Sequence, residues 1–325
     1  MKAVVAGPAG SEVLLGPIGV ALAANEWAVT SLYGDSLGSI EPGCWSEMEI
    51  LICYGLPCGA QELRTARRLR GIVSPTTGYE WIDEDAASDL NIIVANGAVP
   101  ENQESMAEAA ILLTLAALYD LPGAQSELRG AAQRRTPPRM LKGKAIGLLG
   151  YGPIARAMVA RLQGWGADLL VHRRTGACTD ERVRFVGLDF LLEASDVLVL
   201  LASLNDGSRG LIDAAALDRM KVGAILVNVA RGGIVHEQAL AERLADGRLS
   251  MAALDVFETE PLPVGSPLRS LSNAILTPHA IGHTIESFAA IPATAVENAL
   301  ALSRWEIPAS TRNPHIAPAW HSRAG

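Results

Sequence analysis

Three short stretches in the second half of the chain each end an apolar run with one residue that can do chemistry. They are Val-Asn-Val-Ala-Arg231-Gly-Gly, Asp-Val-Phe-Glu-Thr-Glu260-Pro and Thr-Pro-His279-Ala-Ile-Gly. An arginine can hold a carboxylate through two hydrogen bonds, and a histidine can pass a proton near neutral pH. A carboxylate beside the histidine keeps it protonated to higher pH. The three residues together suit hydride transfer to the keto group of a 2-oxo acid.

A glycine-rich turn lies upstream, where residues 145–155 read Ala-Ile-Gly-Leu-Leu-Gly-Tyr-Gly-Pro-Ile-Ala. This pattern predicts a strand, a tight turn and the start of a helix. A dinucleotide-binding turn needs one glycine for the bend, a second where the backbone approaches a pyrophosphate, and a small third residue where helix and strand touch. Gly150, Gly152 and Ala155 meet these needs. The expected dinucleotide site includes Gly150, Gly152, Pro153 and Ile154.

The next predicted strand ends in His172-Arg173-Arg174-Thr175. Enzymes that use NAD usually offer a carboxylate to the ribose hydroxyls at this point. An arginine cannot accept that hydrogen bond, but it can bind a 2′-phosphate. We therefore expect these four residues to contact NADP in preference to NAD. NAD remains the alternative, with the two arginines as ordinary loop residues.

Strands and helices must position these residues, and the first hundred residues alternate between the two. Short apolar strands are expected at 3–6, 49–54, 71–74 and 91–95, with a helix over 60–69. Such alternation predicts a parallel sheet covered by helices. A long helix pattern over 101–121, which Pro122-Gly123 ends, is long enough to cross between two domains. The polar segment 125–141 is expected to be an extended arm.

The second half predicts six further strands, at 145–149, 168–172, 197–201, 224–229, 251–255 and 274–276. Strands separated by helices in this way indicate a doubly wound parallel sheet of the Rossmann type. The helix pattern over 287–304 has no place in that sheet and is expected to fold back on the first domain. The expected fold is thus α/β, with a dinucleotide-binding domain over 99–285 and a smaller, flavodoxin-like α/β substrate domain from 1–98 and 286–325.

Composition argues against several other classes of protein. The chain carries 27 Lys and Arg against 35 Asp and Glu, a net charge of −8, whereas a nucleic-acid surface needs clustered cations. Four cysteines without a metal-ligand spacing fit a reduced, cytoplasmic protein. His283 follows His279 at a zinc-like spacing, but Pro278 and Gly282 disfavour the helix that such a site needs. We expect no metal, no nucleic-acid partner and no membrane partner.

These motifs resemble those of the D-isomer-specific 2-hydroxyacid dehydrogenase family over about residues 48–313. Arg231, Asp255, Glu260 and His279 fall in the family's order. The resemblance implies that Arg231 and His279 bind and protonate the substrate, that Glu260 orients the histidine, and that Asp255 holds the nicotinamide carboxamide. It also implies cofactor contacts from residues around the strand ends: Ser203, Leu204, Val229, Ala230 and Gly282.

The segment Ser74-Pro-Thr-Thr-Gly-Tyr-Glu-Trp-Ile-Asp83 looks like the carboxylate-binding loop of the same family. The resemblance implies that the N–H groups of Thr77 and Gly78 hold the substrate carboxylate. Tyr54 and Thr76 are expected to help line the substrate pocket. The chain departs from the family at Pro153, at Ala155 and in Ser-Leu-Asn at 203–205. These departures concern residues that bind the cofactor, and none of them removes a catalytic group.

The favoured activity is NADP-linked reduction of a small 2-oxo acid such as glyoxylate or hydroxypyruvate. Related formate dehydrogenases carry Gln in place of Glu260, which disfavours that activity. Two alternatives remain open: a phosphite-type dehydrogenase, and a non-enzymatic, dinucleotide-sensing scaffold like the C-terminal binding protein corepressors. The long helix and the arm predict a homodimer in which each arm reaches over the partner.

Overall fold

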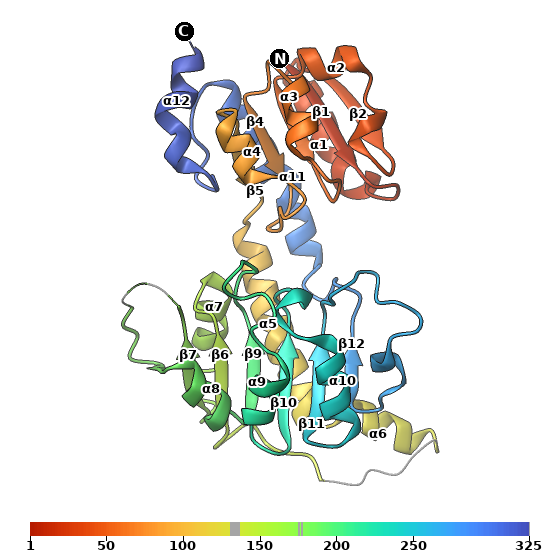
Figure 1. Ribbon diagram of the computed structural model, residues 1–325, viewed down its shortest axis with the longest axis vertical. Helices are drawn as coiled ribbons and strands as arrows, with labels where there is room; N and C mark the ends of the chain where they lie inside the picture. Colours follow the sequence, from red (N-terminus) through yellow and green to blue (C-terminus); the bar gives the residue numbers. More distant parts are fainter. Residues whose placement is uncertain (131–136, 175, 177, 325) are drawn as a thin grey trace. The chain divides into compact units, whose positions relative to one another are not determined.

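The computed structural model describes residues 1–130, 137–174, 176 and 178–324. The chain divides into two compact units, of which unit 1 comprises Met1–Asn102 with Thr284–Gly325 and unit 2 comprises Gln103–His283 (Figure 1). The sequence placed the first boundary at 98 rather than 102, and the second at 286 rather than 284. Both ends of the chain therefore belong to the same unit.

Unit 1 is built on a five-stranded parallel sheet. Its strands are β1 (Lys2–Gly7), β2 (Ala28–Tyr33), β3 (Ile50–Cys53), β4 (Gly71–Ser74) and β5 (Ile93–Asn96), in the order β2-β1-β3-β4-β5. Every residue of β3, β4 and β5 is buried, as strands covered on both faces must be. This order is that of a flavodoxin-like sheet, so the expected class is confirmed.

Two layers of helices cover this sheet. On one face lie α1 (Glu12–Ala24) and α11 (Ile285–Ser303), and on the other lie α2 (Pro42–Glu47), α3 (Ala60–Thr65) and α4 (Glu84–Asp89). Ile291, Ala299 and Leu302 of α11 share one core with Leu15 and Ile18 of α1. The prediction that this late helix folds back on the first domain is therefore confirmed. A short helix, α12 (Ala317–His321), follows and buries Trp320.

Unit 2 is built on a seven-stranded parallel sheet. Its strands are β6 (Ala145–Leu149), β7 (Asp168–His172), β8 (Arg184–Phe185), β9 (Val197–Leu200), β10 (Ala224–Asn228), β11 (Leu249–Leu254) and β12 (Ala274–Leu276). They are ordered β8-β7-β6-β9-β10-β11-β12, and β6 pairs with β9 in the register Ile146↔Val197. The chain runs outward from β6 and then returns to β9 on the other side. A doubly wound sheet binds its ligands at such a reversal, outside the carboxyl ends of the strands.

Helices cover both faces of the second sheet as well. One face carries α5 (Pro100–Leu118) and α7 (Pro153–Arg161), and the other carries α8 (Leu188–Ala194), α9 (Ala214–Arg219) and α10 (Glu237–Ala245). Ala110 and Leu113 of α5 pack with Met158 of α7, while Leu217 of α9 packs with Leu240 of α10. The prediction of a Rossmann-type unit is confirmed.

The expectation of an extended arm over 125–141 is wrong for its first residues. The structure has a helix, α6 (Leu121–Leu128), in this region. Pro122 lies in its first turn, where a helix needs no N–H from the proline, and the Asp120 side chain accepts a hydrogen bond from the Gly123 N–H. The Pro-Gly pair that looked like a helix stop therefore begins a helix. Residues 131–136 of the expected arm lie outside the described residues.

Among the helices of the described residues, none is by itself long and apolar enough to cross a membrane. The pair α5 and α6 would pass that test together, with a bend of 54° between them. In α5, however, Ala107, Ala110 and Leu113 are buried in the core of unit 2.

Candidate active site

Two predicted catalytic residues and one predicted cofactor residue follow three neighbouring strands of unit 2. Arg231 comes shortly after β10, Asp255 comes directly after β11, and His279 comes shortly after β12. These strands are adjacent and parallel, so their carboxyl ends meet at one edge of the sheet. The sheet therefore gathers residues that are up to 48 positions apart in the sequence.

His279 and Glu260 form a direct pair. The Nδ1 atom of His279 lies 2.6 Å from the Glu260 Oε2 atom, and the Phe257 N–H donates to the other carboxylate oxygen over 3.0 Å. Burial by itself raises the pKa of Glu260, but the hydrogen bonds from His279 and Phe257 and the charges of His279 and Arg231 outweigh it, so that the pKa lies below its ordinary value. Glu260 is therefore a carboxylate near neutral pH, and its hydrogen bond leaves the Nε2 atom of His279 for a substrate.

Asp255 holds the loop that carries His279. Its buried carboxylate accepts hydrogen bonds from the Thr277 hydroxyl over 2.6 Å, from the Ala280 N–H over 3.1 Å and from the Ile281 N–H over 3.3 Å. His279 itself has a φ of 53°, a left-handed backbone that is rare for residues with a side chain. Such a conformation persists only when its surroundings fix it, and the three bonds to Asp255 do so on both sides of the histidine.

Arg231, the third predicted catalytic residue, lies in the loop after β10. Its Nη1 atom donates to the Ala230 carbonyl over 2.7 Å, and the Asn228 side chain donates to the Arg231 carbonyl over 3.1 Å. Its charge is also one of the causes of the low pKa of Glu260. Arg231, Glu260 and His279 thus form one electrostatic group.

The glycine-rich turn has the geometry of a phosphate-binding turn. Gly150 has a φ of 105°, and a Cβ atom there would lie 2.8 Å from the backbone of Leu201 and Ala202. Gly152 precedes the first residue of α7, and apart from Gly152 and its two chain neighbours no heavy atom of the described residues lies within 4 Å of where its Cβ would be. This open space in front of free helical N–H groups fits the pyrophosphate of a dinucleotide.

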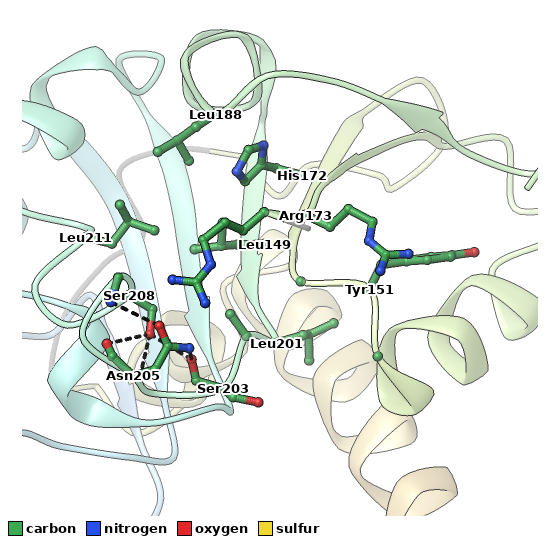
Figure 2. Close-up of a pocket in the computed structure, with 15 residues that line it drawn as sticks. Leu149, Tyr151, His172, Arg173, Leu188, Leu201, Ser203, Asn205, Ser208 and Leu211 are labelled. Atoms are coloured by element: carbon green, nitrogen blue, oxygen red, sulfur yellow. Dashed lines mark hydrogen bonds between the residues drawn. The ribbon is translucent and has the colours of Figure 1, made fainter. Parts of the chain in front are cut away.

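A cavity of about 450 Å³ adjoins this turn (Figure 2). Six of the predicted cofactor residues line it, namely Gly150, Gly152, His172, Arg173, Arg174 and Ser203. Apolar walls come from Leu188, Leu201 and Leu211, which suits an adenine ring. None of the described residues that line the cavity is an Asp or a Glu, so its charged side chains are cationic.

Other predicted cofactor residues lie elsewhere in unit 2. Pro153 and Ile154 begin α7, Leu204 follows β9, Val229 and Ala230 follow β10, and Asp255 and Gly282 lie near the catalytic pair. They are not among the residues that line the cavity. Thr175 lies outside the described residues. No group of three His, Cys, Asp or Glu side chains within the described part of the chain could hold a metal ion.

The predicted substrate residues of unit 1 lie after β3 and β4. The Ser74 hydroxyl donates to the carbonyls of Gly78 over 2.5 Å and Thr76 over 3.2 Å, and the Asn96 side chain donates to the Thr77 carbonyl over 2.7 Å. All three carbonyls of 76–78 are thus bound from within the unit. The N–H groups of the same three residues find no acceptor among the residues that the structure describes, which leaves them for an anionic ligand. Tyr54 lies edge-on against Trp81.

The sequence did not predict nine of the cavity residues. They are Leu149, Tyr151, Leu188, Leu201, Ala202, Asn205, Gly207, Ser208 and Leu211. Leu149 and Leu201 could have been included, because each lies at the carboxyl end of a predicted strand. The Asn205 N–H binds the Ser208 hydroxyl over 2.8 Å in a compact turn that no hydrophobic pattern signals.

Comparison with known proteins bears on this geometry. The family model described as D-isomer specific 2-hydroxyacid dehydrogenase, NAD binding domain, matches residues 111–280. The chain is 33% identical over 271 residues to glyoxylate reductase of Korarchaeum cryptofilum, a match that covers 80% of this chain and 81% of that protein. It is 32% identical over 259 residues to glyoxylate/hydroxypyruvate reductase B of Enterobacter sp., covering 77% and 79%.

A match to D-3-phosphoglycerate dehydrogenase of Mycobacterium bovis is 34% identical over 243 residues and covers 73% of this chain, but it spans only 46% of that protein. Among solved structures, a glyoxylate reductase from Paecilomyes thermophila superposes with a TM-score of 0.85 at 25% identity over 97% of this chain and 99% of that one. NAD-dependent formate dehydrogenase from Staphylococcus aureus, in complex with NAD, superposes with a TM-score of 0.81 at 26% identity over 94% and 96%.

Proposed function

Because this chain belongs to the D-isomer-specific 2-hydroxyacid dehydrogenase family, we propose that it uses NADPH to reduce a small 2-oxo acid such as glyoxylate or hydroxypyruvate. The broader activity, oxidoreduction of 2-oxo and 2-hydroxy acids with NAD(P), follows from the family itself. The observation that carries the proposal is the contact between His279 and Glu260 at the carboxyl edge of the unit 2 sheet.

His279 supplies the proton in this scheme. A bound nicotinamide cofactor would supply the hydride for the keto carbon. Negative charge grows on the keto oxygen as the keto carbon is reduced. The protonated imidazole of His279 donates to that oxygen from Nε2, while Glu260 stabilises its positive charge through Nδ1. In the reverse direction the neutral imidazole accepts the proton of the 2-hydroxyl group.

Arg231 in unit 2 and the 74–78 loop in unit 1 each offer hydrogen-bond donors that suit a carboxylate. The guanidinium of Arg231 polarises the keto group and binds one side of the carboxylate. The free N–H groups of Thr77 and Gly78 offer hydrogen bonds to a carboxylate, since the carbonyls on the other side of that loop are already bound. Asp255 fixes the His279 loop and, as the resemblance implies, is also the residue near the nicotinamide carboxamide.

The lining of the cavity supports the preference for NADPH. Arg173 and Arg174 provide two cations at the end of β7, and the described lining offers no carboxylate to accept hydrogen bonds from a free ribose. The names of relatives support the substrate class, because two of them are reductases of glyoxylate or hydroxypyruvate.

We also propose that the enzyme is a homodimer. Large apolar side chains are exposed along α5 and α6: Leu112, Tyr119, Leu121 and Leu128. An apolar surface of this kind marks a protein interface, and two copies of the chain can bury it by isologous contact of these helices.

A steady-state assay tests the enzymatic proposal. Oxidation of NADPH and of NADH is followed with glyoxylate, hydroxypyruvate, pyruvate and a bulky aromatic 2-oxo acid, and reduction of NADP is followed with phosphite. We expect the highest kcat/KM for a small 2-oxo acid, and an NADPH preference of about tenfold, which Arg173→Asp reverses. Turnover of phosphite alone identifies a phosphite-type enzyme. Tight dinucleotide binding without turnover of any acid identifies a sensing scaffold, and either result contradicts the proposal.

A further inference from the structure

Tyr151 occupies the position between the two glycines of the phosphate-binding turn, and it lines the dinucleotide cavity. Its side chain is almost fully buried and lies edge-on against Phe185 of β8, with ring centroids 5.3 Å apart. A residue at this position needs only a backbone that approaches the phosphates. The large side chain therefore has a task other than phosphate binding.

The hydroxyl group of Tyr151 makes the contact that indicates this task. The Tyr151 hydroxyl donates a hydrogen bond to the Asp180 carboxylate, in the segment that joins β7 to β8. Arg182 holds the same carboxylate through its Nε atom over 2.8 Å, its Nη2 atom over 2.6 Å and its backbone N–H over 3.0 Å. The hydrogen bonds from Arg182 and Tyr151 keep the pKa of Asp180 well below its usual range. Burial is the larger cause, and the hydrogen bond to Asp180 the second, of a pKa of Tyr151 that is raised to about 12. The pair therefore stays intact across the physiological pH range.

This bond connects the glycine-rich turn to the segment that contains the cavity's two cations. Arg173 and Arg174 stand at the beginning of that segment and Asp180 stands near its end, just before β8. Figure 2 shows Arg173 beside the strand end at His172 and directed toward Tyr151. β7 fixes one end of the segment, and the bond from Tyr151 fixes the other against the turn.

We propose that Tyr151 is a positioning residue for cofactor choice: by holding Asp180, it ties the end of the β7–β8 connection to the glycine-rich turn, and so keeps Arg173 and Arg174 where the 2′-phosphate of NADPH binds. This inference rests on the proposed use of NADPH. Asp180 already accepts four hydrogen bonds from Tyr151 and Arg182, which also keeps this nearby carboxylate from serving the ribose hydroxyls of NADH.

The conservative variant Tyr151→Phe tests this role, because it removes one hydroxyl and keeps the ring against Phe185. We expect the ratio of kcat/KM for NADPH to that for NADH to fall about tenfold, through the KM for NADPH. Calorimetric affinity for 2′,5′-ADP should fall by a similar factor, while that for 5′-AMP, which lacks the 2′-phosphate, should fall far less. Tyr33→Phe, which removes a hydroxyl in unit 1, is the matched control and should leave both ratios as in the parent.

A double-mutant cycle separates this role from a general loss of packing. Asp180→Ala should lower the ratio of kcat/KM for NADPH to that for NADH as Tyr151→Phe does. The double variant should show the same ratio as either single variant, because each substitution removes the same hydrogen bond. Two results for Tyr151→Phe would overturn this inference and leave the proposed use of NADPH standing. One is an equal loss of affinity for 2′,5′-ADP and 5′-AMP, and the other is an unchanged ratio of kcat/KM for NADPH to that for NADH. A parent protein that binds 2′,5′-ADP no better than 5′-AMP would refute the use of NADPH and this role with it.

Discussion

His279 is the residue on which the proposed chemistry depends most directly. His279→Gln keeps a polar side chain of similar size but removes the group that gains and loses a proton. We expect kcat for reduction to fall by roughly 10²-fold or more, since general acid catalysis contributes about that much. Stopped-flow turnover gives the rate, and fluorescence titration with NADPH gives the affinity, which should stay close to the parent value. A variant with parental kcat would exclude His279 as the proton donor.

Glu260 sets the pH range over which that donor works. The pKa of Glu260 lies below its ordinary value, so Glu260 is ionised near neutral pH and its negative charge faces the His279 ring. Glu260→Gln removes the charge and keeps the shape. Because the variant lacks the negative charge that pairs with a protonated ring, the range of pH over which reduction is fast should move to lower pH than in the parent. The pH profile of kcat/KM measures this shift, and a coincident profile for parent and variant would remove Glu260 from the mechanism.

Much of the unit 2 site could be predicted at this scale. Arg231, Glu260 and His279 each follow an apolar run, and parallel strands bring their carboxyl ends together. The hydrogen bond from Tyr151 to Asp180 could not be predicted, because its two residues lie on loops whose paths depend on packing rather than on hydrophobic period. The role of Asp255 in holding the His279 loop was hidden for the same reason: its partners are mostly backbone N–H groups, which leave no mark in the sequence.

Among the elements, the 74–78 loop offers the clearest test. The buried Ser74 hydroxyl bonds two of its carbonyls, and Ser74→Ala leaves the Thr76 carbonyl with the Gly97 N–H and the Gly78 carbonyl with the Thr76 hydroxyl. We expect a loss of about 1 kcal/mol in the free energy of unfolding, the usual net contribution of a hydrogen bond whose acceptors keep another donor. Because the loop presents N–H groups to a carboxylate, the KM for the 2-oxo acid should rise several-fold with little change in kcat.

Chemical denaturation and steady-state kinetics measure the two effects of Ser74→Ala. Ser303→Ala, which removes a hydroxyl that donates to the Leu300 carbonyl in α11, is a matched control and should leave the KM for the acid unchanged. A parental KM in Ser74→Ala would show that the loop does not bind the acid.

The elements that the sequence failed to predict share a physical reason. None of the six residues of the edge strand β2 is fully buried, so it needs no apolar run, and β8 has only two residues. The helix α6 has a proline and a glycine in its first turn, a pair that also ends helices, and its start is capped by the side chain of Asp120. Buried parallel strands such as β3 and β4 have the opposite property, because they must be apolar along their whole length, and they were predicted almost to the residue.

For the whole molecule, the proposed homodimer makes a prediction of mass. Light scattering at micromolar concentration should return about twice 34.2 kDa. Leu112→Arg places a charge on the exposed apolar surface of α5, where the side chain is 56% exposed in the single chain, and should yield a monomer. Val222→Arg, at a 77% exposed apolar position outside that surface, should remain a dimer. A parent protein of single-chain mass with full activity contradicts the proposal.

The return of α11 to unit 1 also has a consequence for synthesis on the ribosome. Residues 103–283 complete the cofactor-binding unit while residues 284–325 have still to be translated. Until then one face of the first sheet lacks Ile291, Ala299 and Leu302, and Asn313, which bonds the Val94 N–H in β5, is absent as well. The unit that starts the chain is therefore the last to finish folding, contrary to the usual order from the N-terminus. A nascent chain paused after residue 283 would carry a folded dinucleotide unit behind a first unit whose apolar core is open to chaperones and to aggregation.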